Sequence, residues 1–372
     1  MIMRICLLAW GSRGDVQPLV ALGRGLAAAG HEVTVAADPT YDAMIAAADL
    51  VADPFGAQLE EMLRAPEAQG FRDGSGKGGR HELKRWRAAF RNVAPGVAEH
   101  VTAVVERHDV FLSGLITAAA MFPLARATGK LHIAATLTPS APTRSGSAAV
   151  AAPRPGVDSV LNLAVGWAAL VGSSALTRPV AEATCGRLGL ARPGLRAYLR
   201  EVRRTPVLLG ASPRMVPPPR DVGDRVLTTG YWIDPLDPAY QPPAELADFL
   251  AAGSPPVHLG FGSMPSADPA ALVDLMVAAL HQAGRRGLVS GNWRGWCPDR
   301  LPDDVLFIDD VPHEWLFPRL AGVVHHGGAG TTAAAIRAGL PQLGVPHFGD
   351  QGFWDGGCGS WASVPHRSAA VT

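Results

Sequence analysis

Lysine is nearly absent from this 372-residue chain, and cysteine is scarce as well. Only three of the 33 basic residues are lysines, and 33 acidic residues bring the formal net charge to zero. Electrostatic capture of nucleic acid is therefore not expected. The four cysteines stand far apart, without a Cys-x-x-Cys pair or a histidine cluster, which argues against a disulfide framework and a zinc site. They are Cys6, Cys185, Cys297 and Cys358.

Long apolar runs are also missing. No stretch reaches eighteen uninterrupted apolar residues, so no segment is expected to span a membrane. The run Ile5–Trp10 is too short for the core of a signal peptide. Apolar residues make up 48% of the chain and charged residues 18%, which suits two ordinary cores and argues against disorder. We therefore expect two domains in a soluble protein of a reducing compartment, the cytoplasm.

The first forty residues alternate between strand and helix patterns. Arg4–Trp10 is a short apolar run suited to a strand buried on both faces, and Glu32–Ala36 is a second one. Between them, the leucine spacing of Pro18–Ala29 predicts a helix, and Gly30 follows as its C-terminal cap. This alternation predicts a doubly wound sheet that binds ligands at the carboxyl ends of its strands.

A second series with the same rhythm follows the proline-marked stretch Asp234–Pro256. The elements predicted there are the strand Val257–Phe261, the helix Ala270–Ala283, and the strands Leu288–Ser290, Val305–Ile308 and Val323–His325. The predicted fold class is therefore α/β, with two facing Rossmann-like domains and a cleft between them. We expect the domains to span residues 1–235 and 236–372. Residues 66–80 and 139–156 are rich in Gly, Pro, Ser and Ala and are expected to be mobile loops.

The segment His325–Thr332, with the sequence HHGGAGTT, joins a predicted strand to a predicted helix. Its small residues let a ligand approach the backbone, and the free amides at a helix start favour phosphate. His326 at the rim can donate a hydrogen bond to a pyrophosphate oxygen. A tight strand–helix junction without a ligand would have the same pattern, so the residues alone leave both interpretations open.

Motifs along most of the chain resemble those of bacterial glycosyltransferases of the sterol and glycopeptide- and macrolide-antibiotic family. Gly11–Leu22 is similar to the amino-terminal signature, Leu259–Met264 to the start of the donor domain, and His325–Thr332 to the donor-pyrophosphate motif. Val311–Phe317 is similar to the segment that lines the nucleotide base, and Pro346–Gln351 to the segment that contacts the sugar. The resemblance implies the GT-B fold, with an acceptor-binding first domain and a donor-binding second domain.

The same resemblance implies roles for individual residues. Asp350 and Gln351 would contact the hexose, which favours a glucose-like donor, and Ser12 and Ser263 would lie near the diphosphate. Trp293 would pack near the nucleotide, with plain core burial as the alternative. The other expected donor-site residues are Gly262, Val311, His313, His326, Gly328, Ala329, Gly330 and Thr331, of which His313 is equally well interpreted as a turn residue.

No Asp-x-Asp metal motif lies in context, which agrees with the metal-independent chemistry of the family. Helix-terminus amides would take the place of a cation in stabilising the departing diphosphate. We therefore expect no metal and no cofactor, only a UDP- or TDP-sugar as co-substrate.

Asp15 is the candidate general base. An inverting transfer needs one group that takes the proton of the acceptor hydroxyl, and the resemblance implies this role for Asp15. Helix capping is the alternative, because an Asp just before a helix that has Pro18 in its first turn is good capping chemistry. One residue could fill both roles.

The expected reaction is the inverting transfer of a hexose from a UDP- or TDP-sugar to a hydroxyl of a lipophilic small molecule of sterol, polyketide, macrolide or glycopeptide type. Phe71, Trp86, Phe90 and Trp167 could line the acceptor pocket or fill the core. Two alternatives stay open: a catalytically impaired remnant that binds nucleotide or a partner without turnover, and a nucleotide-sugar epimerase.

The resemblance stops after Trp354. Residues 355–372 lack apolar periodicity and are expected to form neither helix nor strand. Back-translation with GC-rich codons and one inserted base yields a frame similar to the usual continuation of the family, an arginine-rich helix and a Gly-Val-Gly-Pro turn. We hypothesise that a one-base deletion created residues 355–372 and left the second domain incomplete.

Overall fold

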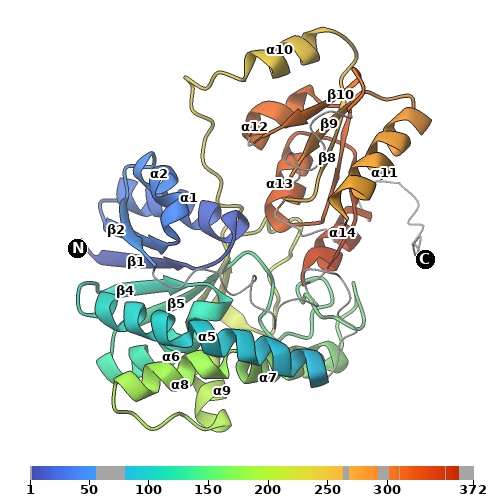
Figure 1. The fold of residues 1–372 in the computed structure, drawn as a ribbon. Helices are drawn as coiled ribbons and strands as arrows, with labels where there is room; N and C mark the ends of the chain where they lie inside the picture. The colour runs from blue at the N-terminus through green and yellow to red at the C-terminus, as the bar shows by residue number, and fades with distance from the viewer. Residues whose placement is uncertain are drawn as a thin grey trace. The chain divides into compact units, whose positions relative to one another are not determined.

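The computed structural model describes residues 2–55, 80–262, 268–291, 301–309, 311–347 and 349–359. These residues form two compact α/β units, of which one ends at Asp234 and the other begins at Pro235 (Figure 1). Each unit has one parallel sheet and its own hydrophobic core. The expected fold class, two α/β units with parallel sheets, is therefore confirmed.

The described part of the first unit contains seven parallel strands in the order β3-β2-β1-β4-β5-β6-β7. The strands are β1 (Arg4–Ala9), β2 (Glu32–Ala37), β3 (Val51–Pro54), β4 (Val110–Ser113), β5 (Leu131–Thr136), β6 (Val207–Leu209) and β7 (Val226–Thr228). The helices are α1 (Arg13–Ala28), α2 (Asp42–Ala46), α5 (Arg80–Val105), α6 (Leu115–Thr128), α7 (Val160–Leu176), α8 (Arg178–Arg187) and α9 (Leu195–Arg204).

Strand β1 shows why this sheet is covered on both faces. Five of its six side chains are buried, and successive side chains point to opposite faces of a strand. Cys6 and Leu8 belong to a core cluster that contains residues of α5 and α6, whereas Leu7 belongs to a cluster with residues of α1 and α2. The apolar run in the sequence is thus a central strand between two helical layers.

Helix α1 begins at Arg13, five residues before the predicted start at Pro18. The earlier start is stabilised by Ser12, whose backbone N–H donates to the carboxylate of Asp15 in the first turn (2.8 Å). Pro18 therefore lies inside the helix, where its missing N–H removes one helix hydrogen bond and its ring crowds the carbonyl four residues earlier. At the other end Gly30 is left-handed (φ +90°), as predicted for a C-terminal cap.

The segment 139–156, expected to be mobile from its composition, is tied down by hydrogen bonds. Asn162 is buried (1% exposed) and donates to the backbone carbonyls of Arg144 (3.0 Å) and Arg154 (3.2 Å). Its amide oxygen accepts from the Arg154 N–H (3.1 Å), and Asp221 accepts from the Arg144 N–H (2.7 Å). The two polar side chains that restrain the loop come from outside it, so composition alone does not reveal them.

The described part of the second unit contains five parallel strands in the order β10-β9-β8-β11-β12. The strands are β8 (Val257–Gly260), β9 (Gly287–Ser290), β10 (Val305–Ile308), β11 (Gly322–His325) and β12 (Gln342–Gly344). The helices are α10 (Ala244–Ala251), α11 (Pro269–Gln282), α12 (His313–Leu316), α13 (Ala329–Arg337) and α14 (Gln351–Gly359). Four of these strands and α11 lie within one residue of their predicted bounds.

Helix α14 contradicts the expectation that residues 355–372 form neither helix nor strand, because it continues through Gly359. Trp354 in this helix is 1% exposed. The carboxylate of Asp355 lies so close to Gly344 that a Cβ there would be 2.2 Å from its Oδ1. Asp355 is thus packed against the end of β12. Residues 360–372 lie outside the described part of the chain.

No single helix in the described part of the chain has the length and apolar character needed to cross a bilayer. The consecutive helices α7 and α8, bent by 55° relative to one another, meet those two criteria only when taken together.

Candidate active site

Asp15 lies in the first turn of α1, directly after the carboxyl end of β1. Its Oδ2 accepts both the backbone N–H (2.8 Å) and the Oγ–H (3.0 Å) of Ser12. A Cβ on Gly11 would come within 2.3 Å of the same oxygen, so only glycine allows the carboxylate to fold back over the turn. Asp15 is therefore an exposed, oriented carboxylate. It occupies the third helical position, not the cap itself, which is Ser12.

Asp109 lies beside the start of β1, at the opposite end of that strand from Asp15. It forms an ion pair with Arg4 (2.7 Å), the residue that begins β1, whereas Asp15 follows the end of that strand. The hydrogen bond from Arg4 lowers the pKa of Asp109 to about 2. Asp109 is thus a surface ion-pair residue.

His325 organises the junction between β11 and α13. Its ring is buried (1% exposed), Nδ1 accepts from the Gly327 N–H (3.1 Å), and Nε2 donates to Oε1 of Gln342 (2.9 Å). These bonds hold Gly327 at φ +82°, a left-handed conformation that favours glycine. A Cβ on Gly327 would also lie 2.8 Å from the backbone oxygen of Gln351. The first glycine of the motif is thus required by the fold itself.

His326 lies between two glycines of the second unit. A Cβ on Gly328 would be 2.5 Å from its Nε2, and one on Gly262 would be 3.2 Å from its Cε1. Burial, followed by the nearby His325 and His347, lowers the pKa of His326 to about 4. The imidazole is therefore uncharged at neutral pH. The ring is hydrogen-bonded to the backbone of Gly260, which acts to raise the pKa, whereas Nδ1 is buried and has no hydrogen-bond partner among the described residues.

The start of α13 presents backbone amides without a side-chain cap. The N-cap residue is Gly328, which has no side chain, and the N–H groups of the first turn have no carbonyl partners within the helix. No atom of the described residues lies within 4 Å of a Cβ built on Gly330 in this turn. The helix dipole adds a partial positive charge at this end. The geometry suits an anion such as a phosphate.

Asp350 and Gln351 are fixed by bonds within their own segment. Asp350 is half-buried, and its Oδ2 accepts from the indole N–H of Trp354 (2.9 Å). Gln351 is 5% exposed, and its Oε1 accepts from the backbone N–H of His347 (2.7 Å). The carboxylate is thus held in one orientation, while the amide oxygen of Gln351 already has a protein partner.

The remaining donor-site candidates lie in different elements of the second unit. Val311 is buried in the core of the second unit. His313 begins α12, and its ring is stacked on that of Phe317 with 4.3 Å between the ring centroids. Ala329 and Thr331 lie in the first turn of α13. The two other candidates, Ser263 and Trp293, lie outside the described residues.

The acceptor-side candidates come from α5 and the segment before it. Phe90 is 3% exposed and belongs to the core of the first unit, with Trp86 half-buried beside it at a ring distance of 6.4 Å. The burial of Phe90 agrees with the core interpretation, and its role at the acceptor stays a prediction. Phe71 lies outside the described residues.

Three residues that organise the site were not singled out by the sequence. His325 fixes Gly327, His347 lowers the pKa of its neighbour His326, and Gly11 makes room for Asp15. The doubled histidine at the end of a predicted strand could have drawn attention to His325.

Two doubly wound α/β units with a Gly-Gly junction at the start of a helix define the class of two-domain, nucleotide-binding α/β proteins. Residues 5–134 match the family model "Glycosyltransferase family 28 N-terminal domain", and residues 297–365 match "Erythromycin biosynthesis protein CIII-like, C-terminal domain". The second match extends to residue 365, beyond Trp354, where the resemblance was expected to stop. With the relative from Streptomyces fradiae described next, these matches show that the chain belongs to the family of sterol and macrolide glycosyltransferases.

Two relatives illustrate the breadth of the family. The chain is 34% identical over 361 residues to O-mycaminosyltylonolide 6-deoxyallosyltransferase of Streptomyces fradiae, covering 95% of this chain and 82% of that one. It is 31% identical over 369 residues to sterol 3-beta-glucosyltransferase UGT80B1 of Arabidopsis thaliana, covering 95% of this chain and 58% of the plant protein. The chain thus spans little more than half the length of that relative.

Solved structures agree on the fold. The glycotransferase of kitacinnamycin has a TM-score of 0.66 at 20% identity, with 97% of this chain and 84% of that chain covered. The glycosyltransferase SsfS6 of Streptomyces sp. SF2575, complexed with thymidine diphosphate, has a TM-score of 0.57 at 23% identity, with 95% and 84% covered. The GT-B architecture predicted from the motifs is therefore confirmed.

Proposed function

We propose that the protein transfers a hexose, with inversion, from a UDP- or TDP-sugar to a hydroxyl group of a lipophilic small molecule. The observation that carries the proposal is the β11–α13 junction, where uncapped amides, the orphan Nδ1 of His326 and the open space at Gly330 coincide. Family membership supports transfer, and the names of the relatives support sterol or macrolide-type acceptors.

On the donor side, the amides of the first turn of α13 would bind the diphosphate and stabilise the charge that develops on it as it leaves. His326, as a neutral imidazole, would donate one hydrogen bond to an oxygen of the diphosphate. Asp350, oriented by Trp354, would accept hydrogen bonds from sugar hydroxyl groups. All of these groups belong to the second unit, and none of them is a metal ligand in this proposal.

On the acceptor side, Asp15 would take the proton of the attacking hydroxyl while its oxygen forms the bond to the anomeric carbon. Ser12 orients the carboxylate through two hydrogen bonds to one oxygen. The glycosidic bond forms as the bond from the sugar to the diphosphate breaks, so the configuration at that carbon inverts.

A glycine substitution tests the donor site directly. Gly330→Ala meets no atom of the described residues within 4 Å, and alanine favours a helix over glycine by about 1 kcal/mol, so the melting temperature should be unchanged or higher. A phosphate at the helix start would meet the new methyl group, so affinity for UDP and TDP should fall. Calorimetry that finds unchanged nucleotide affinity in the Gly330→Ala variant would place the donor elsewhere.

Turnover separates this proposal from the two alternatives. The protein should release UDP or TDP from the corresponding glucose donor only when a sterol, macrolide or polyphenol acceptor is present. Asp15→Asn should lower the rate by about a hundredfold or more, because it removes the general base while preserving the size of the side chain. Nucleotide binding without turnover on any acceptor would favour the non-catalytic remnant.

A further inference from the structure

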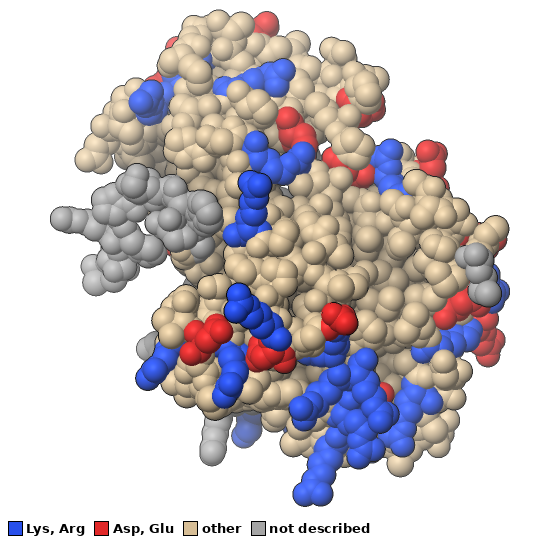
Figure 2. All heavy atoms as spheres, turned by 180° about the vertical axis from the view of Figure 1, so that it is seen from behind, with Lys and Arg blue, Asp and Glu red and all other residues tan. Residues whose placement is uncertain are grey.

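The first unit has a surplus of positive charge on α8 and α9. Residues 178–204 contain seven arginines and two glutamates, in a chain whose formal net charge is zero. Helix α9 positions four exposed arginines at spacings that bring them to one face of the helix. These are Arg196, Arg200, Arg203 and Arg204. Figure 2 shows arginine side chains gathered over this part of the unit.

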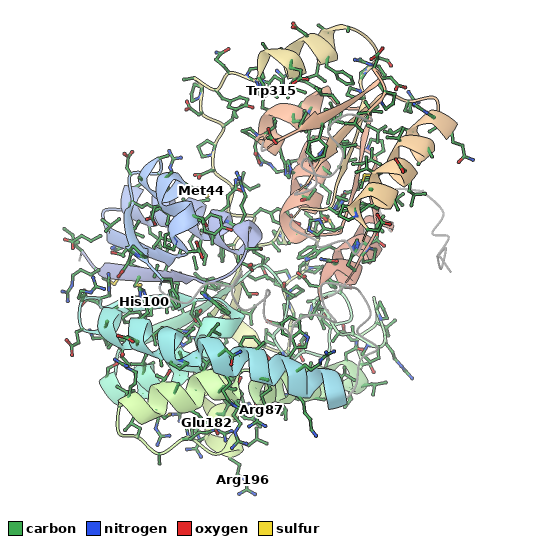
Figure 3. All side chains as sticks on the ribbon, viewed as in Figure 1. Met44, Arg87, His100, Glu182, Arg196 and Trp315 are labelled. Atoms are coloured by element: carbon green, nitrogen blue, oxygen red, sulfur yellow. The ribbon has the colours of Figure 1, made fainter. Side chains whose placement is uncertain are left out.

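The four arginines of α9 carry charge that the protein does not neutralise. In the described part of the chain, none of them forms an ion pair, whereas Arg178 and Arg192 both bind Glu182, at 2.6 and 3.3 Å. Figure 3 shows Arg196 pointing away from α9. The surplus is thus presented outward and is available to an external anion.

Exposed leucines accompany the arginines. Leu190 (41% exposed) lies in the loop between α8 and α9, and Leu195 (49% exposed) begins α9. Each has an arginine close in sequence, Arg192 and Arg196 respectively. We call this set the α8–α9 surface, which consists of Leu190, Arg192, Leu195, Arg196, Arg200, Arg203 and Arg204.

A neighbouring helix joins this surface. The guanidinium of Arg203 lies over the ring of Trp167 in α7, at 5.4 Å from the ring centroid. Helix α7 is made almost entirely of apolar and small residues, yet among its described side chains only Asn162 is classed as buried. The cationic face of α9 therefore continues into an apolar helix that the first unit covers incompletely.

We propose that the α8–α9 surface docks on an anionic lipid bilayer. Arginines attract the negative surface of such a bilayer, and half-exposed leucines between them can enter its interfacial region. A nucleic acid would use the arginines but would gain nothing from the leucines, and stacking on Tyr198 is blocked because that ring is packed against Phe122 (5.4 Å). The proposal does not depend on the transfer reaction, so either can fail alone.

Vesicle sedimentation tests the proposal. The full chain should sediment with vesicles of equal parts phosphatidylcholine and phosphatidylglycerol, but not with phosphatidylcholine alone, and high salt should release it. Replacing Arg196, Arg200, Arg203 and Arg204 together by glutamine should weaken binding by a few hundredfold, since each charge near an anionic surface contributes about fivefold. Leu190→Ser with Leu195→Ser should weaken it about tenfold.

A matched control removes the same charge elsewhere. Arg144, Arg154 and Arg214 are exposed on segments that follow the carboxyl ends of β5 and β6, and Arg285 is exposed in the second unit. Their glutamine variants should leave vesicle binding unchanged. Equal losses in both quadruple variants, or no binding by the parent chain, would overturn the proposal. If the folded Leu190→Ser, Leu195→Ser variant binds vesicles as well as the parent chain, and the parent chain also binds duplex DNA tightly, the surface binds polyanions in general and the bilayer proposal is wrong.

Discussion

At the scale of single residues, glycines reveal which side chains must lie close together. Gly11 allows the carboxylate of Asp15 to fold over the β1–α1 turn, and Gly328 and Gly262 enclose the ring of His326. In each case the functional side chain occupies the space that a Cβ would need. Sequence motifs rich in glycine thus encode the positions of their polar partners, and this can be tested with single methyl groups.

Gly11→Ala should displace the Asp15 carboxylate, because the new Cβ would lie 2.3 Å from Oδ2. The proposed general base would then be misplaced, and we expect turnover to fall by about a hundredfold. Gly25→Ala is the matched control, because Gly25 lies in α1 and a Cβ there has no atom of the described residues within 4 Å. It should raise stability by about 0.5–1 kcal/mol with unchanged turnover. Equal activity in the two variants would mean that the position of Asp15 is irrelevant to catalysis.

His326 should act without a charge. Its pKa of about 4 keeps the imidazole neutral between about pH 6 and pH 8, so affinity for UDP-glucose, whose phosphates do not titrate there, should be flat over that range. His326→Ala should lower the affinity by about 1.5–3 kcal/mol, the usual range for a hydrogen bond to a charged group. A binding constant that rises steeply as the pH falls from 8 to 6 would contradict the neutral imidazole.

At the scale of elements, strands and motif junctions could be predicted from the sequence, but hydrogen bonds between distant segments could not. Apolar runs such as Val305–Ile308 have a local signature, which the structure confirms as β10. The pairing of Asn162 with Arg144 and Arg154 leaves no local signature, because it depends on where the chain returns. For the same reason the loop 139–156 was expected to be mobile.

In the candidate site, too, the features set by local sequence could be predicted, and the contacts that depend on how the chain folds back could not. The resemblance implied roles for Asp15 and His326, and each lies at a strand–helix junction, where backbone geometry is set locally. The motifs did not indicate that Gln351 would be buried with its amide oxygen bound to the His347 N–H, since that depends on how the 346–351 turn folds back. Nor could they show that Asp355 would pack against Gly344, because the segment lacks apolar periodicity.

Helix α14 should orient Asp350 through the hydrogen bond from the indole N–H of Trp354. Trp354→Phe keeps most of the buried ring but removes the indole N–H that binds Asp350, so we expect a loss of stability of about 1.5–3 kcal/mol and a higher KM for the sugar donor. Phe353→Leu, a change at the half-buried neighbouring residue, serves as the control and should leave KM unchanged. If Trp354→Phe alters stability alone, Asp350 has no contact with the donor.

At the scale of the whole molecule, both units contain a buried histidine that is hydrogen-bonded to a serine on the neighbouring strand of the sheet. In the first unit His132 of β5 bonds Ser113 of β4 (2.7 Å), and in the second His258 of β8 bonds Ser290 of β9 (2.8 Å). Burial lowers the pKa of His132 to about 4 and that of His258 to about 3. In both histidines Nδ1 is buried and has no hydrogen-bond partner among the described residues. Protonation of either ring would therefore place an unpaired charge in a core.

Acid should accordingly destabilise both units. A histidine whose pKa falls from about 6.5 in the unfolded chain to about 4 in the folded one contributes stability that is fully present above pH 6.5 and is lost as the pH falls towards 4. Each of His132 and His258 should cost about 2 kcal/mol of folding stability by about pH 5. Urea unfolding between about pH 7.5 and pH 4.5 measures this loss, and the slope against pH should flatten in His132→Gln and in His258→Gln. The half-exposed His281, replaced by Gln, provides the control and should leave the slope unchanged. If the first two variants keep the parental slope, neither ring is buried in its neutral form.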